Sequence, residues 1–335
     1  MNKIITVIAL CALVFANARA QKSTGFHVIN TFHIASTGGW DAIEVGPVHD
    51  WLYLSHGTQV NVLNKITGDS VGIIENTLGV HDIAFDLANH KGFTSNGKLN
   101  TVTVFDMNTN KVLAQIAAGQ NPDIIFYEPF SKKIMVCNGR GKNLSIIDPL
   151  LNKVIDSVDV GGKPEFAASN GAGKLYVNVE DKSEIVEIDT KIFKVLHHWS
   201  LAPGDGPTGL AMDNITHRLF AGCDKKLVVL DAISGKLIDT LAIGSGCDGV
   251  VFDPVLKNIY TSNGDGTITV IHEENANKFT LVENIETKKG ARTLALDLAT
   301  HLLYLPTADF EPQNPGEKGR PKMKPGTFQV LVVGK

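Results

Sequence analysis

Short runs of alternating hydrophobic and polar residues recur along the chain, each roughly four to eight residues long. The runs are rich in Val, Ile, Leu, Tyr and Phe and are bounded by Gly, Asn, Asp and Pro, as in the stretch Gly246–Ile271. This pattern is typical of β-strands joined by turns, whereas no long stretch of sequence shows the 3.6-residue periodicity of a helix. The pattern therefore predicts an all-β protein.

One six-residue pattern occurs seven times. Ile259–Gly264 reads IYTSNG, and its counterparts read LYLSHG, GFTSNG, IMVCNG, LYVNVE, LFAGCD and LYLPTA. The fourth residues of the copies lie at positions 55, 95, 137, 178, 222, 262 and 306, so the period is 40 to 44 residues. Each copy has an apolar run before it and two strand-like runs after it. Four strands in about 40–45 residues is the spacing of a propeller blade, which predicts a seven-bladed β-propeller.

The two ends of the chain complete one blade between them. Thr327–Lys335 matches the third strand of a blade, and His27–Ser36 matches the missing fourth strand. We therefore expect the N-terminal strand of the mature chain to close the last blade, because this pairing removes exposed sheet edges. Residues 21–335 are predicted to form this single propeller domain.

The repeat, seen in LYVN followed by IVEID and in NKVIDSVDVGGKP, resembles the bacterial YVTN (YncE-like) β-propeller repeat family. The resemblance extends over essentially the whole mature chain. It implies an exported or surface protein with a ligand that the family name does not specify. Proteins of this architecture include lactonases and lyases, and DNA binding also enters through the resemblance, so the fold alone does not define the function.

Residues 1–20 have the layout of a secretory signal peptide: Lys3, the apolar run Ile4–Ala16, and Ala18–Ala20 before Gln21. That run is too short to span a membrane, and no other segment is apolar enough. We expect a periplasmic or secreted monomer without a transmembrane segment. The mature chain carries 29 basic and 35 acidic residues, a balance that argues against nucleic-acid binding.

Three cysteines remain after residue 20: Cys137, Cys223 and Cys247. An odd number leaves room for one disulfide at most, and the absence of a CxxC pair argues against structural zinc. Cys223 and Cys247 are predicted on one face of adjacent blades. They either form a disulfide in an oxidising compartment or are two small buried thiols.

Side chains that precede each innermost strand are predicted to ring the mouth of the central channel. Aligned on Asp248, the ring consists of Asp41, His81, Asp123, Glu165, Thr208, Asp248 and Arg292. Converging carboxylates raise one another's pKa unless a cation compensates, so the ring and the adjacent Trp40 are predicted to bind a ligand. Alternatively, the acidic residues accept backbone hydrogen bonds in turns, and Trp40 packs between blades.

Two kinds of chemistry fit this ring. Carboxylate oxygens suit Ca²⁺ or Mg²⁺, which makes Asp41, Asp123 and Asp248 the candidate metal ligands. A histidine beside a carboxylate suits proton transfer, and the candidate catalytic residues are His81, His56 and Glu165. His56 replaces the Asn that ends the second strand of several copies, and we group it with His81 and Asp41.

An insertion at residues 308–326 contains four prolines and the basic residues Lys318, Arg320, Lys322 and Lys324. This composition predicts an irregular loop over the channel mouth. It serves either as a lid that brings positive charge to an anionic ligand or as a solvated loop.

Two functions follow from these features. The first is an exported propeller scaffold that binds a small ligand, a glycan or a cell-surface protein partner around the channel mouth. The alternative is a divalent-metal-assisted hydrolase or lyase, lactonase-like, that uses the Asp/His/Glu ring. A GxSxG nucleophile elbow is absent from the sequence, so serine-hydrolase chemistry is not indicated.

Overall fold

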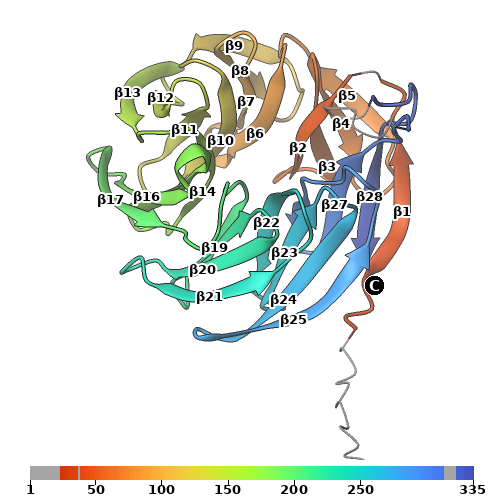
Figure 1. Cartoon of the computed structure of the whole chain (residues 1–335). Coiled ribbons are helices and arrows are strands. Elements are labelled where there is room, and N and C mark those ends of the chain that lie inside the picture. Colours follow the sequence, from red (N-terminus) through yellow and green to blue (C-terminus); the bar gives the residue numbers. More distant parts are fainter. Residues whose placement is uncertain (1–22, 37, 313–321) are drawn as a thin grey trace, which may run out of the picture.

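The computed structural model describes residues 23–36, 38–312 and 322–335, and this part of the chain forms seven four-stranded antiparallel sheets. The sheets follow one another radially around a central axis (Figure 1), which confirms the seven-bladed β-propeller. The predicted signal peptide, Lys318 and Arg320 lie outside the described residues. Among those described, no helix has the length and apolar character that crossing a membrane requires.

The first four blades each run from the innermost to the outermost strand in chain order. Blade 1 contains β2 (Trp40–Val45), β3 (Trp51–His56), β4 (Gln59–Asn64) and β5 (Ser70–Ile74). Blade 2 contains β6 (Val80–Asp86), β7 (Lys91–Asn96), β8 (Thr101–Asp106) and β9 (Val112–Ala117). Blade 3 contains β10 (Pro122–Glu128), β11 (Lys133–Asn138), β12 (Asn143–Asp148) and β13 (Lys153–Asp159). Blade 4 contains β14 (Pro164–Ser169), β15 (Lys174–Val179), β16 (Glu184–Asp189) and β17 (Lys194–Ser200).

Blades 5 and 6 repeat this order, and blade 7 takes its outermost strand from the N-terminal end. Blade 5 contains β18 (Leu210–Asp213), β19 (Arg218–Cys223), β20 (Lys226–Asp231) and β21 (Leu237–Ala242). Blade 6 contains β22 (Cys247–Asp253), β23 (Asn258–Asn263), β24 (Thr267–Asn275) and β25 (Lys278–Glu286). Blade 7 contains β26 (Ala295–Asp297), β27 (Leu302–Thr307), β28 (Gln329–Gly334) and β1 (His27–His33). Two short 3-10 helices, η1 (Leu87–Asn89) and η2 (Glu180–Lys182), lie in connections.

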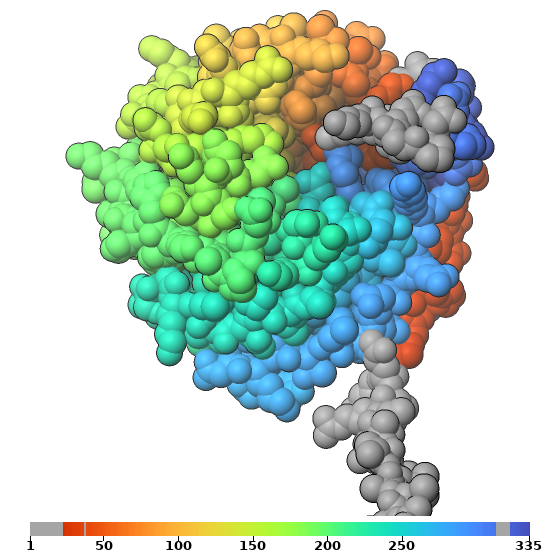
Figure 2. Space-filling view, viewed as in Figure 1, coloured from red at the N-terminus to blue at the C-terminus, as the bar shows by residue number. Residues whose placement is uncertain are grey.

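The closure of blade 7 agrees with the prediction from the sequence. β1 pairs with β28 in antiparallel register, so that Thr31 lies opposite Leu331 and Phe32 lies opposite Val330. The red N-terminal strand therefore lies beside the blue C-terminal blade in Figures 1 and 2. Phe32 is 5% exposed and packs in the hydrophobic cluster that also contains Tyr304. This strand removes an open sheet edge and contributes to the core.

The hydrophobic core lies between neighbouring blades. One cluster, for example, joins Val102 and Val104 of blade 2 to Ile125 and Val136 of blade 3. Side chains of successive residues in a strand point to opposite faces of the sheet, and both faces of each blade are covered by neighbours. The middle strands are therefore buried on both sides, and all six residues of β19 are buried. This burial explains the continuous apolar runs of the repeat.

The antiparallel order divides the loops between two faces of the disk. Connections from blade to blade, and those between the second and third strands, open on the channel-mouth face. Turns between the first and second strands, and between the third and fourth, open on the opposite face. Carboxylates cap many turns of the opposite face: Asp106 Oδ1, for example, accepts the backbone N–H of Thr109 at 2.8 Å. Carboxylates also cap loops of the channel-mouth face, where Asp181 and Asp265 accept the backbone N–H groups of Lys163 and Ser245.

Candidate functional site

A recurrent β-bulge positions the ring of ionisable side chains. Asp41, His81, Asp123, Glu165 and Asp248 each occupy the second position of an innermost strand. In these five blades, the pairing between first and second strands shifts at this point. A bulge releases a residue from the ladder and redirects its side chain. The repeat thus brings one side chain per blade to the channel mouth, where several of the five contact one another.

His81 bridges two carboxylates at the channel mouth. Its Nδ1 lies 2.7 Å from Asp41 Oδ2 and 3.5 Å from Asp123 Oδ1. Burial alone would lower the pKa of His81, but the hydrogen bond to Asp41 and the charges of Asp123 and Asp41 outweigh burial and raise it. The arrangement therefore favours the protonated imidazolium between the two acids.

Arg292 bridges a second pair of carboxylates. Its Nη2 donates to Asp41 Oδ1 at 2.8 Å, and its Nε lies 2.6 Å from Asp248 Oδ2. These side chains are between 20% and 25% exposed, so their charges are only partly screened by water. The structure thus places Asp41, His81, Asp123, Asp248 and Arg292 in one continuous charge network.

Glu165 belongs to a neighbouring ion pair that the sequence did not reveal. Lys163 Nζ lies 2.5 Å from Glu165 Oε1 and also contacts Glu180. Burial raises the pKa of Glu165 to about 8, and the charge of Asp123 adds to this rise while Lys163 opposes it. Thr208, the ring residue of blade 5, instead donates its hydroxyl to the Cys247 carbonyl at 2.7 Å. Thr208 therefore uses its hydroxyl to join blades 5 and 6.

The carboxylates below the ring form a second acidic layer. Asp82 is 3% exposed and accepts hydrogen bonds from the backbone N–H groups of Ile83, at 2.7 Å, and Ile125, at 3.1 Å. Burial raises its pKa to about 7, and the charges of Asp41 and Asp123 contribute. Burial and the charge of Asp82 also raise the pKa of Glu44 in β2. The sequence did contain a sign of this second layer. Asp82 is an acidic residue directly after His81, at the position where the next blade has the apolar Ile124.

Asp123 is a further ring carboxylate whose pKa is raised by its surroundings. Burial raises the pKa of Asp123 to about 6. The positive charges of His81 and Lys163 oppose this rise, and the negative charges of Asp41 and Asp248 add to it. The ionisation of Asp123 is therefore coupled to that of His81, as expected for interacting sites.

The placement of His56 argues against its predicted catalytic role. It is fully buried, its Nδ1 lies 2.6 Å from Ser36 Oγ, and its Nε2 lies 2.9 Å from the Gly38 carbonyl. The imidazole ring of His56 also stacks on the phenyl ring of Phe328, with 4.0 Å between the two ring centroids. Both ring nitrogens are thus occupied by neighbouring groups, and the expected grouping of His56 with His81 and Asp41 is not formed.

The described cysteines are free thiols. Cys137, Cys223 and Cys247 are all buried and unbridged, so the disulfide alternative for Cys223 and Cys247 is not realised in the structure. Burial raises the pKa of Cys223 to about 12 and also raises those of the other two. Apolar side chains pack around them, which matches the alternative of two small buried thiols.

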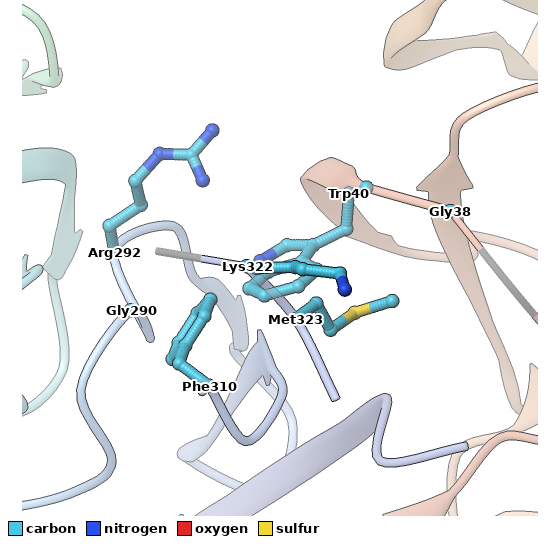
Figure 3. A pocket seen from close by; sticks show the side chains of 8 residues that line it. Gly38, Trp40, Gly290, Arg292, Phe310, Lys322 and Met323 are labelled. Atoms are coloured by element: carbon cyan, nitrogen blue, oxygen red, sulfur yellow. The ribbon is translucent and has the colours of Figure 1, made fainter. Parts of the chain in front are cut away.

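A pocket of about 470 Å³ adjoins the charge network. Its lining consists of Gly38, Gly39, Trp40, Gly290, Arg292, Phe310, Lys322 and Met323. The Trp40 ring lies 6.0 Å from that of Phe310, and Figure 3 shows Met323 beside these rings with Arg292 standing apart from them. Trp40 also packs on Phe328 at 5.4 Å, so it both lines the pocket and joins the core.

The described ends of the insertion build one wall of this pocket. Phe310 and Met323 form an isolated antiparallel bridge, and Lys324 N–H donates to the Asp309 carbonyl at 2.8 Å. Lys322 is paired with Glu311 at 3.5 Å. Sequence reasoning missed Phe310 and Met323 because it considered only the prolines and charges of this segment. The apolar character of Phe310 and Met323, within an otherwise polar segment, was the sequence signal that could have revealed this wall.

The fold and the charged ring together define a seven-bladed β-propeller of repeat type with a candidate site at its channel mouth. No protein-family model matches the chain. Two curated proteins, each called "Uncharacterized protein YncE", from Salmonella typhi and Salmonella typhimurium, are 30% identical to it over 103 residues. This stretch is 30% of the present chain and 29% of each relative, so the chain spans less than a third of the relatives it matches.

A solved structure supports the architecture. A chain of "Kuenenia stuttgartiensis Hydrazine Synthase" superposes with a TM-score of 0.72 over 82% of this chain and 94% of its own length. Its sequence identity is 14%, so this likeness concerns the fold alone. Together with the YncE similarity, it fits a propeller family. The YVTN repeat assignment stays a prediction.

Proposed function

We propose that the protein is an exported ligand-binding propeller that holds a small ring-shaped organic ligand at the channel mouth. The pocket bounded by Trp40, Phe310 and Met323 supports this proposal. Small-molecule sites are typically concave and mostly apolar, with a few polar groups that orient the ligand. The aromatic walls suit a planar ring or the apolar face of a sugar.

The polar rim of the pocket favours a ligand that carries an anionic group. Arg292 has five N–H donors, and its contacts with Asp41 and Asp248 use Nη2 and Nε. Lys322 also lines the pocket and is highly exposed. A carboxylate on the ligand would accept from these cations while its ring packs on Trp40.

Thermal denaturation with matched ligands tests this proposal. Ring-containing carboxylates, including benzoate and galacturonate, are compared with benzyl alcohol and galactose. We expect an anionic member to raise the Tm of the native protein and to lose this effect in Phe310→Ala. The matched control is Phe130→Ala, an exposed aromatic on the opposite face. Equal shifts in both variants, or no shift with any compound, would overturn the pocket proposal.

Export is a separate part of the proposal and rests on residues 1–20. The expected processed protein begins at Gln21 and is recovered from the periplasm or medium. N-terminal mass analysis of the protein from fractionated cells provides the test. An intact leader on protein from the cytoplasm would contradict export without affecting the pocket.

A second candidate function, metal-assisted hydrolysis, is favoured by the cluster of Asp41, His81 and Asp123. One ligand atom from each of these residues lies within 4.8 Å of the others. Asp248 fits less well as a ligand because Arg292 contacts it directly. An imidazole donor favours Mn²⁺ or Zn²⁺ over the Ca²⁺ or Mg²⁺ expected from the carboxylates alone. A cation bound there would act as a Lewis acid toward an ester or lactone carbonyl.

The proton on His81 competes with a metal ion in this second candidate. Nδ1 must lose its proton to become a ligand, so metal affinity should fall as the pH drops through the raised pKa of His81. Glu165 would be the nearby group that holds a proton, since its pKa is raised to about 8. Arg292 and Asp248, the remaining residues of the charge network, would keep the Asp41 carboxylate oriented.

Calorimetric titration with Mn²⁺, Zn²⁺ and Ca²⁺ at two pH values tests the cluster. We expect Mn²⁺ or Zn²⁺ to bind at pH 8 and to bind far more weakly at pH 5.5, with loss of binding in His81→Ala. His198→Ala is the control, because this exposed histidine is paired with Glu184 on an outer strand. Unchanged binding in His81→Ala would exclude the cluster. Metal binding without turnover of a lactone panel would exclude the hydrolase function alone.

A further inference from the structure

A buried glutamate in blade 6 occupies a position that other blades fill with an apolar residue. Glu273 of β24 donates its backbone N–H to the Lys257 carbonyl at 2.8 Å. Ala232 in blade 5 and Met107 in blade 2 make the equivalent bond, and both are buried. Glu273 is 1% exposed, so its carboxyl group is shielded from water, where ionisation is costly. The repeat itself therefore gives no structural reason for a carboxyl group at this position.

The hairpin that carries this glutamate reaches onto blade 5. β24 and β25 have nine residues each, whereas the third and fourth strands of the other blades have five to seven. Figure 1 shows the two long strands beside β21 of blade 5. Arg218 of β19 donates from Nε to the Ala276 carbonyl at the hairpin tip, at 2.6 Å. Phe279 of β25 packs on Phe220 of β19, with 5.9 Å between the ring centroids, so the hairpin is held on blade 5 near its tip.

One threonine hydroxyl contacts two carboxyl groups at this junction. Thr216 Oγ1 lies 2.8 Å from Asp213 Oδ2 and 2.8 Å from Glu273 Oε1. A hydroxyl donates one proton, and an ionised carboxylate can only accept. With two ionised carboxylates, one of these two contacts would therefore contain no proton. The geometry requires one protonated carboxyl group between blades 5 and 6.

Glu273 is the better holder of this proton. Asp213 Oδ1 accepts the backbone N–H of Ile215 at 2.8 Å, a bond that favours the ionised form of Asp213. Glu273 Oε2, in contrast, is buried and meets no hydrogen-bond donor among the described residues. Burial raises the pKa of Glu273 to about 7. The charge of Asp213 and a hydrogen bond with it add to this rise, whereas the hydrogen bond from Thr216 and the charge of Lys257 oppose it.

The other charged groups on the adjoining strands have partners of their own. The guanidinium of Arg218 contacts Asp231 at 2.7 Å. Glu274, the next residue of β24, is exposed and pairs with Lys278 of β25. Ionisation of Glu273 would consequently leave two anions on a single threonine hydroxyl.

We propose that Glu273 is a proton-dependent latch between blades 5 and 6. In its neutral form, Glu273 donates its proton to the pair formed by Thr216 and Asp213 and holds the β24–β25 hairpin on blade 5. When the carboxyl group ionises, this bond is lost, the two anions repel each other, and the hairpin tip separates from the turn between β18 and β19. A carboxyl with a raised pKa contributes stability that is present below its ordinary pKa of 4.5 and is lost as the pH rises through about 7. The latch is therefore closed in acid and open in base.

Hydrogen–deuterium exchange of two hairpins in the same sample tests the latch. Peptides from β24–β25 are compared with peptides from β8–β9 of blade 2, each corrected for its intrinsic exchange rate. We expect exchange in β24–β25, relative to β8–β9, to become about tenfold faster or more between pH 5.5 and pH 8.5. A loss of global stability would affect both hairpins alike. A ratio that stays constant between these pH values would overturn the proposal.

Two glutamine variants on the same strand isolate the carboxyl group. The amide of Glu273→Gln can donate as the neutral acid does but cannot ionise, so β24–β25 should stay protected at pH 8.5. Glu274→Gln is the matched control, because it removes an exposed carboxylate one residue away, and it should show the native rise in exchange. An equal rise in Glu273→Gln and in the native protein would overturn the latch.

Infrared difference spectroscopy observes the proton directly. The spectrum of the native protein minus that of Glu273→Gln should contain the carbonyl band of a protonated carboxylic acid at pH 5.5. This band should be replaced by that of an ionised carboxylate at pH 8.5. An ionised carboxylate in the difference spectrum at pH 5.5 would overturn the proposal, whatever the exchange rates are.

Discussion

Arg292 contacts Asp41 across the seam at which the propeller closes. The two residues are 251 positions apart, yet Nη2 of Arg292 lies 2.8 Å from Oδ1 of Asp41. Blade 7 is therefore joined to blade 1 at the channel mouth by an ion pair, in addition to the strand pairing of β1 with β28 inside blade 7. The same guanidinium also holds Asp248 of blade 6.

Removal of this guanidinium should weaken the closure. Arg292→Ala removes the cation that Asp41 and Asp248 share in a partly buried site, although Asp41 keeps its contact with His81. We expect a loss of about 1–3 kcal/mol in unfolding free energy. Arg292→Lys should lose less, because it keeps the charge but not the two-sided geometry of a guanidinium. Urea unfolding measures both variants. Equal midpoints for Arg292→Ala and the native protein would show that the bridge does not stabilise the fold.

Asp82 should make stability depend on pH. Its folded pKa of about 7 lies above the ordinary 3.8, chiefly because of burial. A carboxyl with a raised pKa contributes stability that is present below pH 3.8 and is lost as the pH rises through 7. Asp82→Asn cannot ionise, so the decline between pH 5 and 8 should shrink by about 1–3 kcal/mol.

Unfolding curves across this pH range compare Asp82→Asn with Asp156→Asn. Asp156 also accepts the N–H of the next residue, Ser157, at 2.7 Å, but it is exposed. The control should therefore leave the pH dependence unchanged. An unaltered slope in Asp82→Asn would mean that the raised pKa belongs to another group of the network.

Gly92 is required by a close contact across two strands. A Cβ at this position would lie 1.9 Å from Cζ of Phe105, its partner in the ladder. Gly92→Ala should therefore cost about 3 kcal/mol or more through overpacking. Gly72→Ala is the control, since a Cβ there meets nothing within 4 Å.

A compensating variant distinguishes overpacking from a backbone effect. Phe105→Leu shortens the side chain that faces Gly92, so its combination with Gly92→Ala should recover part of the lost Tm. Thermal unfolding of the two single variants and the double variant gives the coupling. Strictly additive losses would contradict the contact as the cause.

The three buried thiols should remain unreactive in the native protein. Burial raises the pKa values of Cys137, Cys223 and Cys247 and keeps them as neutral thiols, which are poor nucleophiles. We expect Ellman's reagent to label none of them until guanidinium is added. All three should then react without a reductant. Only one reactive thiol after denaturation would reveal a disulfide.

The repeat period by itself determined the propeller, its seven blades and the strand that closes the last one. Each blade is a meander of neighbouring strands, so its pattern is local, and the copies can be aligned on one another. The alignment on Asp248 also selected Asp41, His81, Asp123 and Arg292, which the structure brings into contact. It could do so because the same bulge recurs in most of these blades.

Contacts between copies could not be obtained from the period. The sequence did not indicate that His81 bridges Asp41 and Asp123, that Asp82 lies beneath the ring, or that Phe310 and Met323 build a wall against Trp40. His56 shared a position with turn residues, but a backbone carbonyl and a serine hydroxyl occupy its nitrogens. The sequence thus determined the blade and its register, because these depend on neighbouring residues. Only the tertiary structure decided which charges compensate one another, because those partners come from different blades and meet only when the ring closes.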